Sequence, residues 1–393
     1  MKIAMVHPHD IFSDMEPWTV RVTYLAKEFV KKGHQVQLIY FPVDSINLPE
    51  KSTLDGIEII PLSRKANPLI FLRNIRDLRE IFRDVDVVHF QKCFHFCAIP
   101  VVCASWLTKK PLHYDWDDWE TKIYFLGGTP PSRLTGLFMH TVESLLPRVV
   151  DTISVASEAL RKRALSLGFR DKRIFEAHVG GDLESFHPRV PNDTIRKKYN
   201  ISGPIVLYLG QLHGGQYAHL FVRAAKIVCQ QHPEPHVTFM LVGGGHNEGQ
   251  IKNLIRETGV ENNVLLTGLI PHHYVPEYVA AADLAVACFE DNDITKCKSP
   301  LKIVEYLAAG KAIVASDVGE VRNMLEGVGS IVPPGDEKSL ADEILRLIVN
   351  PGLRLHMGQK ARQRAEEKYN WTVTANNILN AYQLALFMNN KSA

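Results

Sequence analysis

The sequence of 393 residues lacks the features of several specialised protein classes. Its net charge is only +2, so no strong field favours nucleic acid or strongly acidic partners. The most apolar stretch, Phe94–Leu107, is shorter than the ~20 residues that cross a bilayer. There is no tandem repeat and no low-complexity tract. The six cysteines include no Cys-x-x-Cys pair, and we expect reduced thiols. A composition of 46% apolar and 22% charged residues is that of an ordinary globular protein.

The most apolar segments are consistent with a core rather than with a leader or an anchor. The N-terminal run MKIAMVHPHD is too short for the core of a signal peptide and is expected to form a strand. We therefore expect a cytoplasmic protein. Phe94–Leu107 is expected to be a buried helix that covers a sheet, with contact at the inner face of a membrane as the alternative.

The first half of the chain alternates apolar strands with amphipathic helices. A helix over about Pro17–Lys32 has apolar residues at i, i+3, i+4 and i+7 from Val22, and Gly33 ends it. Strands that alternate with helices imply crossover connections and a mostly parallel sheet. The strands are expected at Lys2–His7, His34–Tyr40, Val85–Phe90, Pro111–Asp115, Asp151–Ser154 and Arg173–Ala177.

The same pattern restarts after Asp182–Pro204, which we interpret as the interdomain connection. We predict an α/β protein of two Rossmann-like, doubly wound domains that face a central cleft: residues 1–190, with the C-terminal helix 372–393 packed back on them, and residues 204–371. In such sheets, ligands bind beyond the carboxyl ends of the strands. The second series of strands is expected at Ile205–Gly210, His236–Val242, Val264–Gly268, Leu284–Cys288, Ala312–Ser316 and Ser330–Val332.

The segment Lys298–Gly310 carries the clearest chemistry. Ser299 is a suitable N-cap and Pro300 suits the first helical position. The helix start would then offer free backbone N–H groups to an anion, and Lys302 would add a positive charge. Glu305, one turn later, could accept hydrogen bonds from ribose hydroxyls. The structural alternative is a capped amphipathic helix with a solvated Glu–Lys pair.

This segment resembles the donor-binding region of the family 4 glycosyltransferases, which have the GT-B fold. Other segments resemble the same family in the expected order, and the similarity spans nearly the whole chain. They are Met1–His7, Leu25–Val36 (LAKEFVKKGHQV), Asp84–His89, Ile153–Leu160, Val179–Pro188, Val206–Leu212 (VLYLGQL), Phe239–Gly245 (FMLVGGG), Leu266–Leu284, Ala312–Gly319 (AIVASDVG), Gly329–Leu340 and Trp371–Tyr382.

The resemblance implies a nucleotide-sugar donor site in the C-terminal domain. Glu305 matches the second glutamate of a family pair separated by seven residues, which binds the donor ribose in relatives. The resemblance also implies a retaining reaction that needs no bound metal and no cofactor. The remaining donor residues that it implies are Ser299, Pro300, Leu301 and Lys302 near the sugar and diphosphate, Gly268, Leu269 and Ile270 near the base, and Gly210, Gln211 and Gly243 at strand ends. The run Gly243–Gly245 is by itself more typical of a plain tight turn than of a loop that approaches a ligand.

The sequence departs from the family at four places. Cys297 replaces the first glutamate of the pair, and Gln211 and Gln216 replace an arginine and a lysine that clamp the diphosphate. Ser13–Arg21 replaces a glycine-rich turn, and an aspartate, Asp117, replaces the N-domain histidine. Charge-assisted hydrogen bonds are roughly twice as strong as neutral ones, so Lys302 and the helix dipole must carry more of the phosphate binding. Arg21 is a further candidate for that task.

The acidic segment His113–Glu120 (HYDWDDWE) is the second candidate site. Alternation along an extended segment would direct Asp115 and Asp117 to one space, and closely placed carboxylates raise each other's pKa. We favour acceptor recognition or acid–base catalysis by Asp115, Asp117 and Asp118, with tryptophan faces against sugar rings. The alternatives are a surface loop anchored by two partly buried tryptophans and, least favoured, a metal site.

The resulting hypothesis is a hexosyltransferase that moves a sugar from a nucleoside diphosphate sugar, by default a UDP-sugar, to an acceptor hydroxyl in glycan or glycoconjugate biosynthesis. The acceptor is expected to be a glycan, a lipid-linked sugar or a small molecule, and nucleic acid is not expected as a partner. Two alternatives are a nucleotide-sugar epimerase of the same fold and a degenerate, non-catalytic binding subunit.

Overall fold

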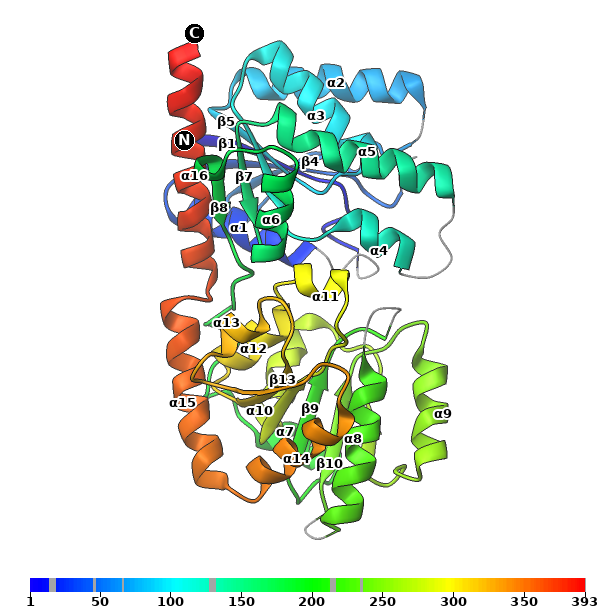
Figure 1. Cartoon of the computed structure of the whole chain (residues 1–393). Coiled ribbons are helices and arrows are strands. Elements are labelled where there is room, and N and C mark those ends of the chain that lie inside the picture. The colour runs from blue at the N-terminus through cyan, green and yellow to red at the C-terminus, as the bar shows by residue number, and fades with distance from the viewer. Residues whose placement is uncertain are drawn as a thin grey trace. The chain divides into compact units, whose positions relative to one another are not determined.

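The computed structural model describes residues 1–13, 19–44, 47–65, 67–126, 132–212, 217–233 and 236–392. The chain forms two compact α/β units (Figure 1). Unit 1 takes almost all residues up to His178 and also Trp371–Ala393, whereas unit 2 is formed mainly by Val179–Asn370. The predicted fold class is confirmed.

Unit 1 is built around an eight-stranded sheet, with strands in the order β3-β4-β2-β1-β5-β6-β7-β8. All its neighbouring pairs are parallel except β3 with β4. Its elements are β1 (Lys2–His7), α1 (Val20–Lys31), β2 (Gln35–Tyr40), β3 (Ser52–Leu54), β4 (Ile57–Pro61), α2 (Pro68–Arg83), β5 (Val87–Gln91), α3 (His95–Thr108), β6 (Leu112–Trp116), α4 (Glu120–Leu126), α5 (Arg133–Val149), β7 (Thr152–Val155), α6 (Glu158–Ser166), η2 (Asp171–Arg173), β8 (Ile174–Glu176) and α16 (Trp371–Ser392).

Unit 2 contains a parallel six-stranded sheet in the order β11-β10-β9-β12-β13-β14. Its elements are α7 (Asp193–Lys198), β9 (Ile205–Leu209), α8 (Ala218–Gln231), β10 (Thr238–Val242), α9 (Glu248–Thr258), β11 (Val264–Leu266), η3 (His272–Tyr274), α10 (Val275–Ala281), β12 (Leu284–Ala287), α11 (Asp293–Cys297), α12 (Leu301–Ala308), β13 (Ala312–Ser316), α13 (Val321–Leu325), β14 (Ser330–Val332), α14 (Glu337–Ile348) and α15 (Pro351–Glu367).

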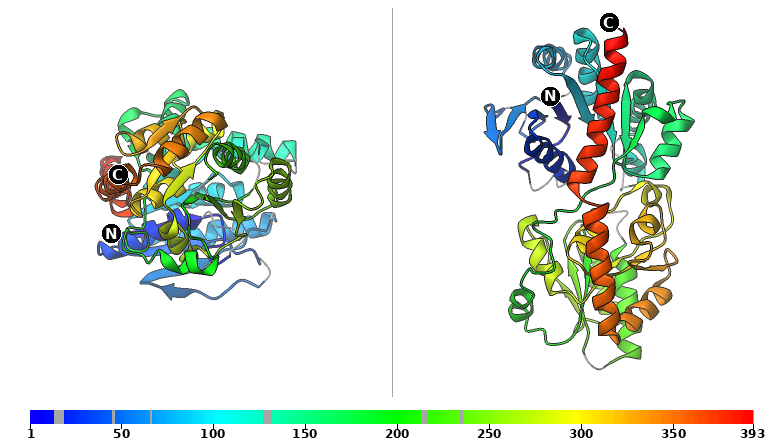
Figure 2. Two further views of the ribbon diagram at one scale, coloured as in Figure 1. Left: turned by 90° about the horizontal axis from the view of Figure 1, so that it is seen from below. Right: turned by 90° about the vertical axis from the view of Figure 1, so that its left-hand side faces the viewer.

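The C-terminal helix α16 belongs to unit 1. It packs beside α1 and against the strands β6, β7 and β8 (Figure 2, right). Trp371, its first residue, stacks on Tyr24 of α1 with ring centroids 5.4 Å apart. Tyr382 places its buried hydroxyl 2.8 Å from Nδ1 of His89 on β5. These contacts fix α16 on one face of the sheet.

The boundary between the units lies earlier than the predicted residue 190 because Val179–Arg189 packs on unit 2. Phe186 is buried in the core of unit 2. Arg362 of α15 donates to the carbonyl oxygen of Phe186 at 2.9 Å. A Cβ on Gly181 would lie 2.9 Å from the carbonyl oxygen of Val304, so the chain runs very close to α12 there.

Each sheet has a topological switch point where ligands are expected. In unit 2 it lies between β9 and β12, and the chain beyond β12 leads through α11 to the start of α12. In unit 1 it lies between β1 and β5. The helix start at Lys302 and the acidic segment after β6 therefore lie at the ends of the sheets where the predicted sites belong.

Candidate functional site

Three of the predicted donor-site glycines lie side by side at the carboxyl ends of β9, β10 and β11. Gly210 donates to the carbonyl oxygen of Val242 at 3.0 Å, and Gly243 donates to that of Gly268 at 3.1 Å. A Cβ on Gly243 would lie only 1.9 Å from the carbonyl oxygen of Gly210, so this glycine is needed for backbone packing itself. The three glycines therefore leave the carboxyl ends of these strands without side chains at their positions. Leu269, which follows Gly268, is exposed.

The start of α12 differs from the prediction. Pro300, with φ −69° and ψ 117°, is the N-cap, and the helix begins at Leu301. The prediction that Ser299 caps the helix is wrong, because its Oγ instead accepts a hydrogen bond from the backbone N–H of Val179 at 3.2 Å. No side chain caps α12. Its first N–H groups therefore keep the capacity to bind an anion.

Lys302 is the unusual residue of this helix. Its Nζ is buried and has no hydrogen-bond partner among the described residues. It lies 4.1 Å from the ring centroid of Tyr208 and 5.7 Å from that of Phe289, so the ammonium makes cation–π contacts with two aromatic rings. Burial lowers the pKa of Lys302 to about 8. A buried ammonium without a counterion is unfavourable, and an anion bound at the helix start would remove that cost.

Glu305 lies on the same helix and is buried. Its Oε1 accepts a hydrogen bond from Nε2 of His272 at 2.9 Å, so the solvated Glu–Lys pair considered above does not form. The hydrogen bond to Glu305 raises the pKa of His272, against the effect of burial, and the charge of Asp182 adds to the increase.

Sequence reasoning missed His272. The residue follows directly on the predicted base-binding segment Gly268–Ile270 and opens η3, and that proximity was the only available signal. Of the family departures, Gln211 is half-buried at the end of β9 and Cys297 is buried at the end of α11. Gln216 and part of Ser13–Arg21 lie outside the described residues.

In unit 1, Asp115 is the centre of a buried hydrogen-bond network. Arg21 donates to both its carboxylate oxygens at 2.7 Å, and Gln91 and Ser154 donate to them as well. Burial alone would raise the pKa of Asp115, but Arg21 lowers it below its usual range. Arg21 also donates to the carbonyl oxygen of Ala177. Asp115 and Arg21 thus bind each other. Asp115 is not available for acid–base catalysis, and Arg21 is not available for phosphate binding, which are the roles that the sequence had suggested.

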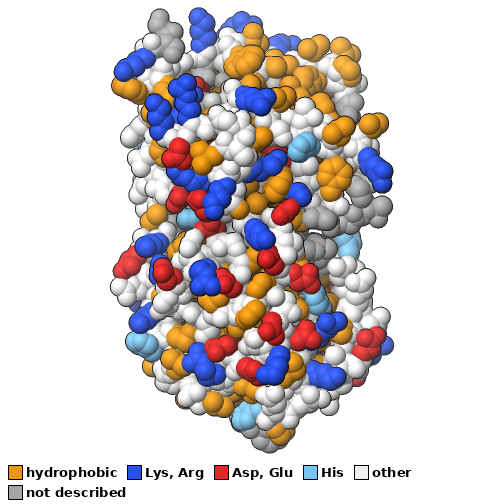
Figure 3. All heavy atoms as spheres, viewed as in Figure 1, with side chains coloured by type: hydrophobic (Ala, Val, Ile, Leu, Met, Phe, Trp, Pro, Cys, Tyr) orange, Lys and Arg blue, Asp and Glu red, His pale blue; other side chains and the backbone are white. Residues whose placement is uncertain are grey.

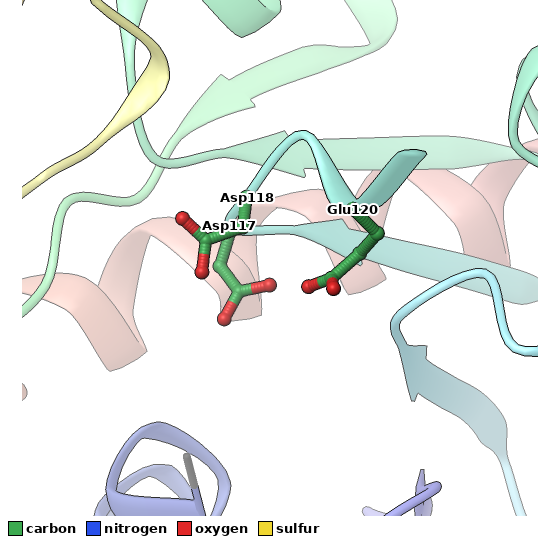
Figure 4. A group of neighbouring side chains, drawn as sticks. All are labelled: Asp117, Asp118 and Glu120. Atoms are coloured by element: carbon green, nitrogen blue, oxygen red, sulfur yellow. The ribbon is translucent and has the colours of Figure 1, made fainter. Parts of the chain in front are cut away.

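Asp117 and Asp118 in the turn after β6, and Glu120 at the start of α4, form a separate cluster with carboxylate oxygens close to one another (Figure 4). Nζ of the buried Lys92 lies 2.9 Å from Asp117, 3.4 Å from Asp118 and 2.5 Å from Glu120. Lys92 directly follows β5 with φ 66°, an uncommon conformation for a residue with a side chain. The ammonium ion supplies the positive charge that a metal ion would supply here, which disfavours a metal site.

The cluster has unusual acid–base properties. Burial raises the pKa of Glu120 to about 7, although Lys92 counteracts this effect. Burial also raises the pKa of Asp117, again against the effect of Lys92. The side chains of Asp117 and Asp118 remain 15% and 26% exposed, so both can contact a ligand.

The two tryptophans of this segment serve packing. Trp116 is fully buried, with its ring centroid 5.7 Å from that of Tyr114, and cannot stack on a sugar. Trp119 is half-buried, with the guanidinium of Arg163 4.0 Å above its ring. Glu143 of α5 accepts hydrogen bonds from the indole of Trp116 and from the backbone of α4, which fixes the helix start beside the acidic cluster.

Two family models match the chain. The model "Glycosyltransferase Family 4" matches residues 19–185, and "Glycosyl transferases group 1" matches residues 191–364. None of the helices in the described parts of the chain is long and apolar enough to cross a membrane.

The chain is similar to curated glycosyltransferases. A phosphatidyl-myo-inositol mannosyltransferase of Mycobacterium leprae is 36% identical over 98% of this chain and 96% of its own length. An uncharacterized glycosyltransferase of Methanocaldococcus jannaschii is 21% identical over 99% of both chains. The α-D-kanosaminyltransferase of Streptomyces kanamyceticus is 25% identical over 61% of this chain and 66% of its own length.

Solved structures share the fold. The Anabaena protein HepE in complex with UDP and glucose superposes with a TM-score of 0.74 at 18% identity over 98% of this chain and 99% of its own. A sucrose-phosphate synthase from Thermosynechococcus elongatus superposes with a TM-score of 0.73 at 19% identity over 99% of both.

Proposed function

Because the chain belongs to glycosyltransferase family 4 and is a hexosyltransferase of the GT-B type, we propose that it transfers a hexosyl group from a nucleoside diphosphate sugar to an acceptor hydroxyl. The favoured donor is a UDP-sugar, and the proposed reaction retains the configuration of the anomeric carbon. Its proposed place is glycan or glycoconjugate biosynthesis.

The observation that carries this proposal is the buried ammonium of Lys302, which has no hydrogen-bond partner among the residues that the structure describes, beside the uncapped start of α12. During transfer, negative charge develops on the diphosphate leaving group. Lys302 and the free N–H groups of the helix start would stabilise that charge at a site already shielded from water. This arrangement lets a chain with Gln211, in place of the family's arginine, still hold a diphosphate.

The other proposed donor contacts rest on the resemblance to the family. Glu305 would accept hydrogen bonds from the ribose hydroxyls through its carboxylate. Ser299, Pro300 and Leu301 would contact the sugar and diphosphate, and Gly210, Gln211 and Gly243 would border the phosphates at the strand ends. Gly268, Leu269 and Ile270 would pack against the base, for which the exposed side chain of Leu269 is suited.

Asp117 and Asp118 are the proposed acceptor-binding residues. Their partly exposed carboxylates can accept a hydrogen bond from the attacking hydroxyl and orient it. Asp115 would act indirectly, by fixing Arg21 and the end of β6. The acceptor class is a glycan, a lipid-linked sugar or a small molecule, and the name of the mycobacterial relative supports a lipid-linked one.

Neither a metal ion nor a cofactor has a role in this proposal. Lys302 supplies the positive charge at the leaving group, and Lys92 neutralises the acidic cluster. The sequence has no Cys-x-x-Cys pair, and the proposed location is a reducing compartment such as the cytoplasm.

Thermal unfolding with UDP, GDP, ADP and dTDP tests the donor site. A ligand at 100 times its dissociation constant should stabilise the folded state by about 2.7 kcal/mol. We expect stabilisation by one nucleotide, lost in Glu305→Ala and kept in Glu257→Ala, which changes an exposed glutamate of α9. No stabilisation by any nucleotide, or equal stabilisation in both variants, would argue against the proposal.

The epimerase alternative predicts a different product. An epimerase would convert the nucleotide sugar into its epimer when the donor is supplied alone, whereas a transferase without an acceptor would leave the donor unchanged or transfer the sugar slowly to water and release the nucleoside diphosphate. Chromatography of the nucleotide products after incubation without acceptor distinguishes the two.

A further inference from the structure

The helix α5 exposes an apolar stripe that the described residues of unit 1 leave uncovered. Leu134, Leu137, Phe138 and Leu145 are 79%, 60%, 47% and 45% exposed, although large apolar side chains are usually buried. Their spacing of 3, 4 and 11 residues from Leu134 places them on one side of the helix. The opposite side packs inward through Met139, Val142 and Leu146. The stripe is thus a second apolar face of α5, additional to the one that contacts the core.

Positive charge surrounds this stripe. Arg133 and Arg148, at the two ends of α5, are exposed and pair with no carboxylate among the described residues. The one acidic residue of α5, Glu143, is buried, where it fixes the start of α4. The neighbouring helix α3 contains no acidic residue and is followed by Lys109 and Lys110. The outer surfaces of α3 and α5 therefore combine apolar groups with positive charge alone.

The apolar surface continues from α5 onto its neighbours. α3 packs against both α2 and α5, and the ring of His95 on α3 lies 5.4 Å from that of Phe138. Leu69 and Leu72 near the start of α2 are also exposed, as are Trp106 and Leu107 near the end of α3. Figure 3 shows hydrophobic side chains gathered over the part of unit 1 where Figure 1 places α2, α3 and α5, with lysines and arginines at the margin.

We propose that this face of unit 1, defined by Arg133, Leu134, Leu137, Phe138, Leu145 and Arg148, binds the surface of an anionic membrane. Apolar side chains on one helix side that enter the headgroup region, flanked by arginines that pair with lipid phosphates, characterise interfacial helices. Charge complementarity selects this occupant over a second copy of the chain, because two positively charged faces repel each other. The face would keep the enzyme at a membrane without a spanning helix.

Co-sedimentation of the full chain with vesicles tests the proposal. We expect binding to vesicles of phosphatidylcholine mixed with phosphatidylglycerol, weak binding to phosphatidylcholine alone, and weaker binding to the anionic vesicles as salt is raised. Leu134→Glu/Leu137→Glu and Arg133→Glu/Arg148→Glu should each reduce binding at least about tenfold. Leu355→Glu, at a leucine of α15 that is 67% exposed, is the matched control and should not change it.

Three outcomes would overturn the proposal: no binding of the wild type to anionic vesicles, binding that both double variants retain, or a dimer in sedimentation velocity that the leucine variant dissociates. The last result would assign the face to a second copy. The proposal does not rest on glycosyl transfer. Nucleotide stabilisation measured without vesicles should be unchanged in both double variants, which also shows that they are folded.

Discussion

Nε2 of His272 donates a hydrogen bond to Oε1 of Glu305 over 2.9 Å, and this contact links the loop after β11 to helix α12. Because a carboxylate only accepts hydrogen bonds, the imidazole must carry its proton at Nε2. Glu305 is buried, so the bond fixes one carboxylate oxygen and leaves the other lone pairs for a ligand. We interpret His272 as a residue that positions Glu305 for the donor ribose.

Replacing His272 by alanine should weaken nucleotide binding about tenfold, equal to about 1.4 kcal/mol, because the carboxylate loses its orientation. His272→Gln keeps a neutral donor and should restore most of the affinity. Calorimetric titration of the nucleotide into both variants measures the effect. Tighter binding in His272→Ala would mean that the imidazole competes with the ribose.

Nucleotide affinity should fall as the pH rises above about 8. Burial lowers the pKa of Lys302 to about 8, and only the ammonium form attracts a diphosphate. Above that pH, one proton must be taken up for each ligand bound, so the dissociation constant should increase about tenfold per pH unit. Lys302→Met should bind weakly at every pH and lose this alkaline dependence, whereas Lys360→Met, at an exposed lysine of α15, should behave like wild type. The same alkaline dependence in Lys302→Met would assign the titration to another group.

Lys92→Met should destabilise the folded protein by about 3–5 kcal/mol, because three carboxylates lose their buried counterion. Lysine and methionine are equally unsuited to the left-handed backbone conformation at residue 92. The loss of the positive charge should therefore determine the change in stability. Burial raises the folded-state pKa of Asp117 and Glu120 above the unfolded values, and the variant removes the ammonium that counteracts this effect. The variant should therefore regain stability as the pH falls through those values. Urea unfolding at several pH values measures this, and a loss independent of pH would contradict it.

Asp115→Asn and Asp117→Asn should have different effects. The first leaves Arg21 buried without its carboxylate and should cost about 3–5 kcal/mol of stability. The second should preserve stability and nucleotide affinity but lower kcat with a saturating acceptor about a hundredfold or more. Stability and steady-state kinetics of both variants, with Asp118→Asn for comparison, test the assignment. A stable but inactive Asp115→Asn variant would indicate that Asp115 takes part in catalysis and not only in the ion pair with Arg21.

Periodic patterns in the sequence predicted most of the fold. The strands β1, β13 and β14 have the predicted bounds, because each is a buried apolar run between clear terminators. The hairpin of β3 and β4 was missed. Ser52–Leu54 is exposed throughout, so it carries no apolar alternation, and Ile57–Pro61 ends in a proline.

The site was less predictable than the fold, because its charges pair over long sequence separations. Asp115 pairs with Arg21, and Asp117 with Lys92, through contacts that only the sheet order creates. Local patterns did identify Lys302 and Glu305 on one helix. They could not show that Lys302 would lack a hydrogen-bond partner among the described residues or that Glu305 would pair with His272, because both facts depend on segments that precede α12 by many residues.

We propose that a nucleoside diphosphate binds at the start of α12 with a phosphate on Lys302. A crystal structure of the protein grown with the nucleotide that stabilises it most tests this directly. We expect a diphosphate oxygen within hydrogen-bond distance of Nζ of Lys302 and ribose hydroxyls on the carboxylate of Glu305. A nucleotide bound elsewhere, or a phosphate held without Lys302, would contradict it.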